Sequence, residues 1–488
     1  MAELIAVLIA LLALWLIGYA TVRLVAPERS ILGPDEIAGL AWFVGCGVCS
    51  FALFLFSAAG GTLSQGLVWM LSAVGAATAA TARCRSGSNP AADSKAEHLR
   101  RSEWLVVALI ALLFVCIVIP TVMTSVVSWD AMSQWALTAK IVYYGRTVWA
   151  RYMVDPALGH SKAGYPMLLQ LNQVWADLFI GRYDDRWVQM ICPLYYGALL
   201  LVFNGACRRH VGRAKALVGT LVVATLYPLR MPGGGATEIM ADVPLAGFCF
   251  AAAMLGLLSF EQRSLRLWAL SAFLIACAAF TKREGAGHVL IYVLVFGLAT
   301  IAMRRTTVPS ALRRWLVAAV IILPLLVGWE SYRRCVVPAS EAAYYHTPTP
   351  AKVRSLLRER AWPVAKSFLF EMIVPPPRSD KSVLFWNGVW ILLPLTTLAA
   401  WRETTRVPLL CIVLWLLAAL GMYAVTYVMT ASVTEIGGLI DVTLRRLLIH
   451  IVPLTAYVEV RQLGYIFRWK TGLAAADAAN DRNRIARH

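Results

Sequence analysis

The residues most able to do chemistry in this sequence are charged side chains at the ends of long apolar runs. Asp130 is the first of them, because it directly follows an apolar run at 104–127 and lies in a helix-forming segment at 128–146. One interpretation is that this acid is available for chemistry at a membrane edge. The other is that Ser128 caps the helix and Asp130 is a first-turn residue favoured by the helix dipole. The sequence alone leaves both open.

Two adjacent arginines, Arg445 and Arg446, lie near the outer end of the last apolar run at 442–460. Charged side chains within a membrane-spanning helix are costly, so at least one of the two should face an aqueous or protein-lined cavity. The alternative is that both extend to the lipid headgroups. We favour a binding role for one of them, and we expect His450, one turn beyond Arg446, to be a packed core residue.

A third charged group, formed by Lys282, Arg283 and Glu284, separates two apolar runs. Gly285 and Gly287 follow it, and we expect these glycines to supply a tight turn that directs the charges to the same outer region as the other candidates. The alternative is an ordinary hairpin with an internal Lys–Glu pair.

Four further polar residues are weaker candidates. Glu238 and Asp242 are four residues apart, so a helix would place them on one face, where they could hold a metal ion or bind sugar hydroxyls. Two carboxylates without further ligands make a poor cation site, and hydrogen bonding to neighbouring helices is the simpler interpretation. Lys140 and Lys162 lie in the first long loop and could reach a phosphate, although loop lysines are usually solvated.

The composition indicates which elements must position these residues. Of the 488 residues, 59% are hydrophobic and 15% are charged, and a water-soluble domain cannot bury that much apolar surface. The sequence contains about 13 runs of the roughly 20 apolar residues that a membrane-spanning helix needs. We therefore predict an all-α polytopic membrane protein. The net charge of +18 comes from basic residues in short loops. Basic residues at such positions set the orientation of a membrane protein, so we interpret the charge as a topology signal rather than as a sign of nucleic-acid binding.

The distribution of Lys and Arg predicts the topology. If the basic segment at 83–102 is cytoplasmic, every later short loop rich in Lys and Arg falls on the same side. The N-terminus is then outside and the C-terminus inside. Residues 1–102 form an N-terminal group of spans with a cytoplasmic loop, 103–460 form the core, and 461–488 form a basic cytoplasmic tail. Motifs of zinc peptidases, serine hydrolases and nucleotide-binding proteins do not occur in the sequence.

Two long segments, 128–186 and 331–382, fall on the outer side. Polar residues interrupt the apolar stretch at 165–181 within the first, which predicts an interfacial or partly re-entrant helix rather than a span. The stretch at 351–374 within the second mixes basic and apolar residues at helical spacing. This pattern is typical of a helix lying on the outer leaflet, where anionic headgroups favour it.

Taken in order, these features resemble the GT-C class of integral-membrane glycosyltransferases, and within it the protein mannosyltransferase and aminoarabinose transferase superfamily, which take sugars from polyprenyl-phosphate carriers. In that class a span leads into a large external loop with an aspartate near its start, then helices along the membrane, then a Tyr-Pro or Lys-Pro-Pro element. This chain has Asp130, an amphipathic segment and Gly-Tyr-Pro at 164–166 in that order. Three later segments are similar to spans of such enzymes: 241–255, 276–290 and 443–454. The resemblance covers roughly 104–460, and the first hundred residues have no counterpart in the core of the class.

The resemblance implies a role for each candidate. Asp130 would be the base that takes the proton of the acceptor hydroxyl while the anomeric carbon is attacked with inversion. Fixed cations would meet the negative charge of the leaving phosphate, for which arginine supplies a planar pair of donors. Arg445 or Arg446 is the first cationic candidate and the group at 282–284 is the second, and Tyr165 belongs to the substrate-binding set. No metal ion is obligatory, although a divalent ion stays open.

The resemblance also implies a bacterial inner membrane with the active site facing the periplasm. The partners would be a lipid-linked sugar donor and an envelope glycan or lipid acceptor, with no nucleic acid. One alternative is a ligase that transfers a whole lipid-linked oligosaccharide, for which Arg333, Arg334 and His346 are candidates. Another is a transporter or flippase, against which the sequence shows no internal repeat and places its charges at the outer edge. A structural scaffold would leave Asp130 and Arg446 without a role.

Overall fold

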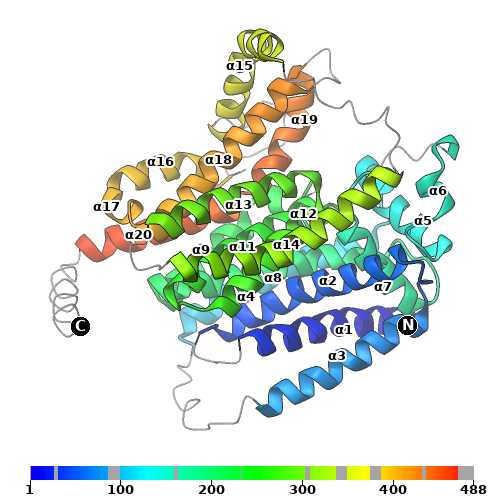
Figure 1. Ribbon diagram of the computed structural model, residues 1–488. Coiled ribbons are helices and arrows are strands. Elements are labelled where there is room, and N and C mark those ends of the chain that lie inside the picture. Colours follow the sequence, from blue (N-terminus) through cyan, green and yellow to red (C-terminus); the bar gives the residue numbers. More distant parts are fainter. Residues whose placement is uncertain are drawn as a thin grey trace.

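The computed structural model describes residues 2–26, 31–85, 99–158, 163–231, 233–302, 308–336, 349–373, 386–430 and 436–470. Across these ranges the chain is helical and contains no strand (Figure 1). The predicted all-α class is therefore confirmed for the described part of the chain.

Eight helices in the described ranges are long and apolar enough to cross a membrane. They are α1 (Ala2–Val25), α2 (Pro34–Ala58), α4 (Arg101–Met123), η3 with α8 (Trp187–Met190 and Ile191–Val211), α11 (Asp242–Glu261), α13 (Arg283–Ala302), α14 (Val308–Val336) and α18 (Val407–Met429). Two shorter apolar helices are α12 (Leu265–Thr281) and α16 (Val389–Ala399). These helices make the chain a membrane protein, and the larger number of about 13 spans stays a prediction.

The remaining helices are shorter or more polar. They are α3 (Gln65–Arg85), the π-helix η1 (Ala131–Ala136), α5 (Leu137–Gly145), α6 (Arg151–Val154), η2 (Pro156–Leu158), α7 (Leu168–Ile180), α9 (Arg213–Thr225), α10 (Tyr227–Arg230), α15 (Pro350–Ile373), α17 (Trp401–Thr404), α19 (Ile436–Ile449) and α20 (Val452–Lys470).

Helix α11 forms the centre of the bundle. Every residue from Asp242 to Ser259 is buried, because the helix is apolar on all sides and neighbouring helices enclose it. Helices α8, α12, α13, α19 and α20 pack against it (Figure 1). Its first residue, Asp242, therefore lies within protein and is shielded from lipid.

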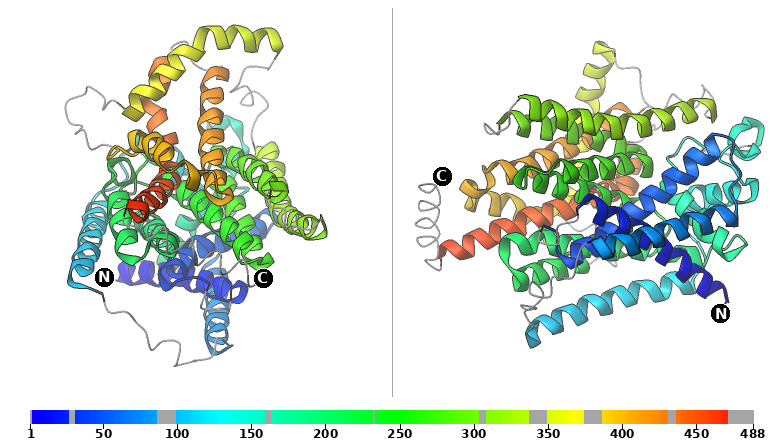
Figure 2. Two further views of the ribbon diagram at one scale, coloured as in Figure 1. Left: turned by 90° about the vertical axis from the view of Figure 1, so that its left-hand side faces the viewer. Right: turned by 60° about the horizontal axis from the view of Figure 1, so that its bottom comes forward.

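Two helices lie away from this centre. Helix α4 runs along the edge of the bundle (Figure 2), and its only buried residues are Glu103, Ile117 and Thr121. Such an exposed apolar surface is typical of a helix that faces lipid. Helix α15 projects from the bundle beside α18 and α19 (Figure 1). Its bounds confirm the helix predicted at 351–374, while its position on the outer leaflet stays a prediction.

The segment at 165–181 forms helix α7, and its predicted interfacial position is wrong. Protein encloses the helix, since every residue except Ile180 is buried and α1, α2, α3 and α5 pack around it. The polar residues that interrupt its apolar sequence point into the protein, where Asn172 Nδ2 donates a hydrogen bond to Tyr195 Oη at 3.0 Å. The helix therefore presents no apolar face to a membrane surface.

The predicted single span at 442–460 is also wrong. Helix α19 ends at Ile449 and α20 begins at Val452, because Pro453 lacks an N–H group and disfavours helical geometry in the residue before it. The backbone N–H groups of His450 and Ile451 bond three residues back instead of four, at 3.2 Å each. The break orients His450 toward the start of α11.

Glycines allow α1 and α2 to approach each other closely. A Cβ atom on Gly18 would collide with the Ala41 carbonyl oxygen, and one on Gly45 would collide with the Leu14 carbonyl oxygen. Small residues of this kind let the backbones of membrane helices come into contact. The pair thus fixes the packing of the N-terminal helices on the core.

We expect Gly45→Val to lower the free energy of unfolding by about 1–3 kcal/mol, because its side chain overpacks the contact between α1 and α2. Chemical unfolding in detergent, followed by tryptophan fluorescence, measures the change. Gly328→Ala in α14 is the matched control, since nothing lies within 4 Å of a Cβ at that position. Equal stability of Gly45→Val and the wild type would contradict the assigned contact.

Candidate functional site

The carboxylate of Asp242 organises a cluster of charged side chains at the start of α11. Its Oδ1 accepts hydrogen bonds from Lys282 Nζ at 2.7 Å and His450 Nε2 at 2.9 Å. Its Oδ2 accepts from Arg446 Nε at 3.3 Å and Nη2 at 3.2 Å. Asp242 is fully buried, and a buried carboxylate is stable only when it is paired in this way.

The loop before α11 folds back over this cluster. Gly233 and Gly234 adopt φ values of 92° and 119°, a backbone region that residues with a side chain rarely occupy. A Cβ on Gly234 would lie 3.2 Å from Arg446 Cγ and 3.5 Å from Asp242 Oδ2. The glycine-rich sequence therefore lets the backbone of this loop pass close to Asp242 and shield its carboxylate from water.

Lys282 enters the cluster from the junction between α12 and α13. Its backbone is extended, with φ −155° and ψ 155°, so the chain turns without the tight glycine turn that we expected. Gly285 is helical and instead lets α13 approach the Ala278 carbonyl oxygen of α12. Burial alone would lower the pKa of Lys282, but Asp242 and Glu284 outweigh it and raise that pKa above its ordinary value. The two carboxylates therefore favour the charged form of Lys282.

Arg446 connects this buried cluster to the exposed carboxylate of Asp130. Its Nη1 bonds Asp130 Oδ2, while its Nε and Nη2 hold Asp242. The side chain of Asp130 is 41% exposed and that of Arg446 is 14% exposed. One arginine thus joins a buried and an accessible carboxylate.

Asp130 reaches Arg446 from the short segment between α4 and the π-helix η1. The Ser128 hydroxyl has no hydrogen-bond partner among the described residues, so the helix cap that we considered for Ser128 does not form. A π-helix forms hydrogen bonds between residues five apart and occurs frequently at functional sites. It places Asp130, Gln134 and Trp135 along the wall of one cavity.

This space, which we call the charged cavity, has a volume of about 440 Å³. Its wall carries five charged side chains, those of Asp130, Lys282, Arg283, Glu284 and Arg446. The rest of the wall includes Trp135, Tyr165, Tyr423, Tyr427 and Thr443. The cavity therefore offers an accessible carboxylate and three cations to one small ligand.

Arg283 differs from the other two cations of the charged cavity. Its guanidinium lies over the ring of Tyr165, 4.3 Å from the centroid, which is a favourable cation–π geometry. It makes no ion pair with any described residue, whereas Lys282 bonds Asp242 and lies 3.3 Å from Glu284. Arg283 is thus the cation with an uncompensated charge.

Six of the predicted residues line the charged cavity, and two others, Arg445 and Lys140, do not. Asp130, Tyr165, Lys282, Arg283, Glu284 and Arg446 line it, and Asp242 lies directly behind it. Arg445 faces away and bonds Glu371 Oε1 at 3.0 Å, because adjacent helical residues point in different directions. Lys140 is exposed beside the ring of Tyr183 at 5.4 Å and does not line the charged cavity, so its binding role stays a prediction. Lys162 lies outside the described residues.

The predicted pairing of Glu238 with Asp242 on one helical face is wrong. Helix α11 begins only at Asp242, so Glu238 lies in the preceding loop and accepts a hydrogen bond from Gly233 N at 3.2 Å. Both oxygens of Asp242 are occupied by cationic groups, which leaves no place for a metal ion. No group of three or more metal-ligating side chains occurs within the described ranges.

Two residues to which the sequence assigned no functional role lie in this cluster or next to it. His450 is buried as expected, but it bonds Asp242 and so belongs to the cluster. Arg230 lines a second cavity of about 400 Å³ together with Glu238, Ser128 and Ala131. This second cavity lies on the α4 side of η1. The only sequence signal for His450 was its spacing of four residues from Arg446.

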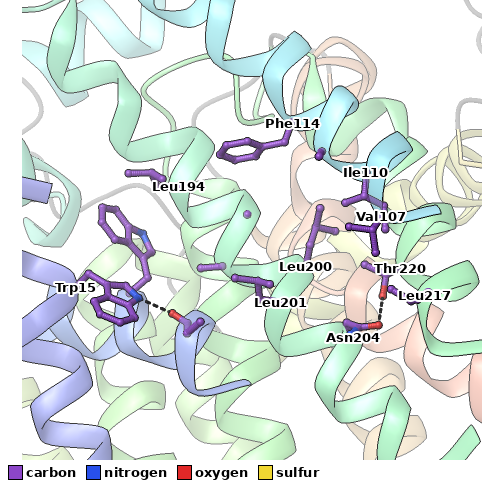
Figure 3. Close-up of a pocket in the computed structure, with 15 residues that line it drawn as sticks. Trp15, Val107, Ile110, Phe114, Leu194, Leu200, Leu201, Asn204, Leu217 and Thr220 are labelled. Atoms are coloured by element: carbon purple, nitrogen blue, oxygen red, sulfur yellow. Dashed lines mark hydrogen bonds between the residues drawn. The ribbon is translucent and has the colours of Figure 1, made fainter. Parts of the chain in front are cut away.

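A third cavity, of about 500 Å³, lies between α1, α2, α4, α8 and α9 (Figure 3). Its wall is almost entirely apolar and includes Trp15, Ile110, Phe114 and Leu201. It follows α4 over residues 107–114, and the second cavity continues along α4 from Cys116 onward. The two spaces therefore succeed each other along the lipid-facing helix.

Comparison with known proteins gives no independent assignment, because no protein-family model matches the chain and no curated protein matches it. The geometry of the site therefore carries the functional argument.

Proposed function

We propose that the protein is a membrane glycosyltransferase of the GT-C type, which transfers a sugar from a polyprenyl-phosphate carrier to an envelope glycan or lipid. The observation that carries this proposal is the position of Asp130. It is an accessible carboxylate at the wall of a cavity that also holds three cations. A base beside fixed cations is the combination that transfer from a phosphate leaving group requires.

In the proposed reaction Asp130 accepts the proton of the acceptor hydroxyl. The hydroxyl oxygen forms a bond to the anomeric carbon as the bond between that carbon and the phosphate oxygen breaks, with inversion. The electron pair of the broken bond leaves with the polyprenyl phosphate, whose added negative charge Lys282, Arg283 and Arg446 stabilise. No other reactant is needed to balance the step.

Arg283 is the group that we assign to first contact with the phosphate. Arg446 and Lys282 already share the charges of Asp130, Asp242 and Glu284. Arg283 has no such partner among the described residues and is exposed beside Tyr165. Once the phosphate reaches Arg446, it competes with Asp130 for the guanidinium and releases that carboxylate to act as a base.

The cavities along α4 suit the lipid part of such a donor. The apolar third cavity is bounded by a helix whose outer face is exposed (Figure 3), so an isoprenoid tail could enter it from the bilayer. The second cavity then leads along α4 toward Ser128 and Ala131, next to Asp130. The tail would thus stay in apolar surroundings while the headgroup meets the charges.

Ion pairs at helix ends support the proposed topology, in which residues 103–460 form the catalytic core of an inner-membrane enzyme. Arg209 bonds Glu36, Arg213 Nη2 bonds Glu103 at 2.8 Å, and Arg461 Nη2 bonds Glu403 at 2.8 Å. Each pair joins segments that the Lys and Arg distribution assigns to the cytoplasm. The Asp130 segment belongs to the opposite, periplasmic side in this topology.

The two arginines considered for an oligosaccharide ligase form ion pairs outside the charged cavity. Arg333 Nε bonds Glu330 Oε2 at 2.7 Å, and Arg334 Nε bonds Glu330 Oε1 at 3.0 Å on the same helix. His346, the third candidate, lies outside the described residues. Neither arginine lines the charged cavity.

The test is transfer of radiolabelled sugar from synthetic polyprenyl-phosphate donors to extracted envelope acceptors. We expect membranes that contain the protein to transfer label and membranes from a deletion strain to transfer none. Failure with every monophosphate-linked donor, together with transfer from a diphosphate-linked oligosaccharide, would replace this proposal by the ligase. Failure with both donor types would overturn glycosyl transfer altogether.

We expect Arg283→Gln to raise the KM for the donor roughly tenfold or more, because a charge-assisted hydrogen bond to phosphate is worth about 1.5–3 kcal/mol. The KM for the acceptor should not change. Arg266→Gln, which replaces an exposed arginine in the first turn of α12, is the matched control. An unchanged donor KM for Arg283→Gln would remove this residue from the phosphate site.

A further inference from the structure

A chain of hydrogen bonds leads from Asp242 into the bundle through side chains that the proposed reaction does not use. Trp415 Nε1 bonds His288 Nδ1 at 3.1 Å, and His288 Nε2 lies 2.8 Å from Tyr423 Oη. Tyr423 Oη lies 3.2 Å from His450 Nδ1, and His450 Nε2 lies 2.9 Å from Asp242 Oδ1. All five side chains are at most 1% exposed.

The first donor fixes the direction of the whole chain. An indole N–H only donates, so His288 Nδ1 must accept and carries no proton. The proton of this imidazole is then on Nε2, which donates to Tyr423 Oη. The single hydroxyl proton of Tyr423 is left for His450 Nδ1, which therefore also accepts, and His450 Nε2–H donates to Asp242. Every donor finds an acceptor only when both histidines are neutral and protonated on Nε2.

The charge state of His450 determines how the negative charge of Asp242 is divided among its hydrogen-bond partners. Lys282 Nζ and His450 Nε2 bond the same oxygen, Oδ1. A positive charge on His450 would be the third at this site and would compete with Lys282 and Arg446 for one carboxylate. A neutral His450 donates one hydrogen bond, orients the carboxylate and leaves its negative charge to the two cations.

We propose that Trp415, His288, Tyr423 and His450 are positioning residues that hold Asp242 in one orientation and keep His450 uncharged, and so place Lys282 and Arg446 for an anionic phosphate ligand. The phosphate part of this inference rests on the proposed function. This chain of hydrogen bonds passes through residues of α18, α13 and the break between α19 and α20 before it reaches α11. It therefore couples four separate parts of the bundle to the charged cavity.

The groups that face His450 come from every element around it. They are Asp242 of α11, Lys282 and Glu284 at the start of α13, His288 of α13, Tyr423 of α18 and Arg446 of α19. Within the described part of the protein, the Tyr423 hydroxyl is the only group that hydrogen-bonds His450 Nδ1. Removal of this hydroxyl is thus the smallest change that frees His450 to take up a proton.

The experiment compares Tyr423→Phe with the wild type by nitrogen NMR of the full chain in lipid nanodiscs with isotope-labelled histidine. The protein has 7 histidines. The substitutions His450→Asn and His288→Asn identify the signals of these two residues. In the wild type we expect both imidazoles to stay neutral and protonated on Nε2 between about pH 5 and 8. In Tyr423→Phe the His450 signal should titrate. Titration of His450 in the wild type near its ordinary pKa of about 6.5 would overturn the inference.

Transfer kinetics test whether the chain positions the cations. For Tyr423→Phe we expect the donor KM to rise about tenfold and to rise further as His450 becomes protonated at lower pH, with a smaller change in kcat. Tyr292→Phe is the matched control, because this buried tyrosine of α13 bonds Ser271 at 3.0 Å and stands outside the chain. An unchanged donor KM beside altered NMR signals would make the chain structural only. Absence of transfer by the wild type would contradict the proposed function while the NMR result still decides the neutral state of His450.

Discussion

Asp130→Asn is expected to lower kcat for sugar transfer by about 100-fold or more, because an amide cannot accept the proton of the acceptor hydroxyl. The donor KM should stay the same or fall, since Arg446 loses a carboxylate that competes with the phosphate. A loss confined to kcat is the signature of a group that acts in the transition state. The measurement is the transfer assay with membranes matched for protein level.

Asp441→Asn supplies the control for this substitution. Asp441 lies on α19 with Arg446 but is exposed and does not line the charged cavity. It should leave both kinetic parameters unchanged. Asp130→Glu, which keeps the base and moves it by one methylene, should retain more activity than Asp130→Asn. Equal transfer by Asp130→Asn and the wild type would show that the carboxylate is only a partner of Arg446.

The second large effect is expected for Asp242→Asn, which removes the negative charge that two buried cations share. Breaking a buried ion pair by removing one partner costs about 3–5 kcal/mol, because the remaining charge is left uncompensated. We therefore expect a loss of stability of this size and a loss of transfer activity. Chemical unfolding in detergent gives the first quantity and the transfer assay the second.

A double substitution separates these two consequences of Asp242→Asn. Lys282→Met removes one of the stranded charges, so Asp242→Asn with Lys282→Met should recover much of the lost stability. Its transfer activity should stay low, because the charged cavity then lacks a cation. Recovery of both stability and activity would mean that Lys282 and Asp242 serve folding alone.

Much of the fold follows from the hydrophobic runs of the sequence. Ten of these runs correspond to the apolar helices, including the shorter α12 and α16. The break at His450 and Ile451 was missed, because one proline within an apolar run is compatible both with a kinked continuous helix and with the start of a new one. The burial of α7 was missed as well, since polar residues in an apolar helix suit an interface and a protein interior equally.

The sequence predicts which residues gather at the site better than it predicts the role of each residue. Topology alone placed Asp130, Lys282 and Arg446 on one side of the membrane. The choice between Arg445 and Arg446 depends on a rotation of one residue about the axis of α19, which hydropathy does not define. The role of His450 depends on the start of α11 and on the break before α20, two boundaries that are among the least certain features of any sequence.

The contact between Arg446 and Asp130 also implies an order of events in the proposed reaction. Without donor, Asp130 Oδ2 accepts a hydrogen bond from the Arg446 guanidinium, so an acceptor that enters the charged cavity meets a carboxylate oxygen that is already occupied. In the proposed reaction, the arriving phosphate would compete for Arg446 and so free the carboxylate. The enzyme would then follow an ordered sequential scheme in which the donor binds first, and Asp130 would become available as a base only while a donor occupies the charged cavity.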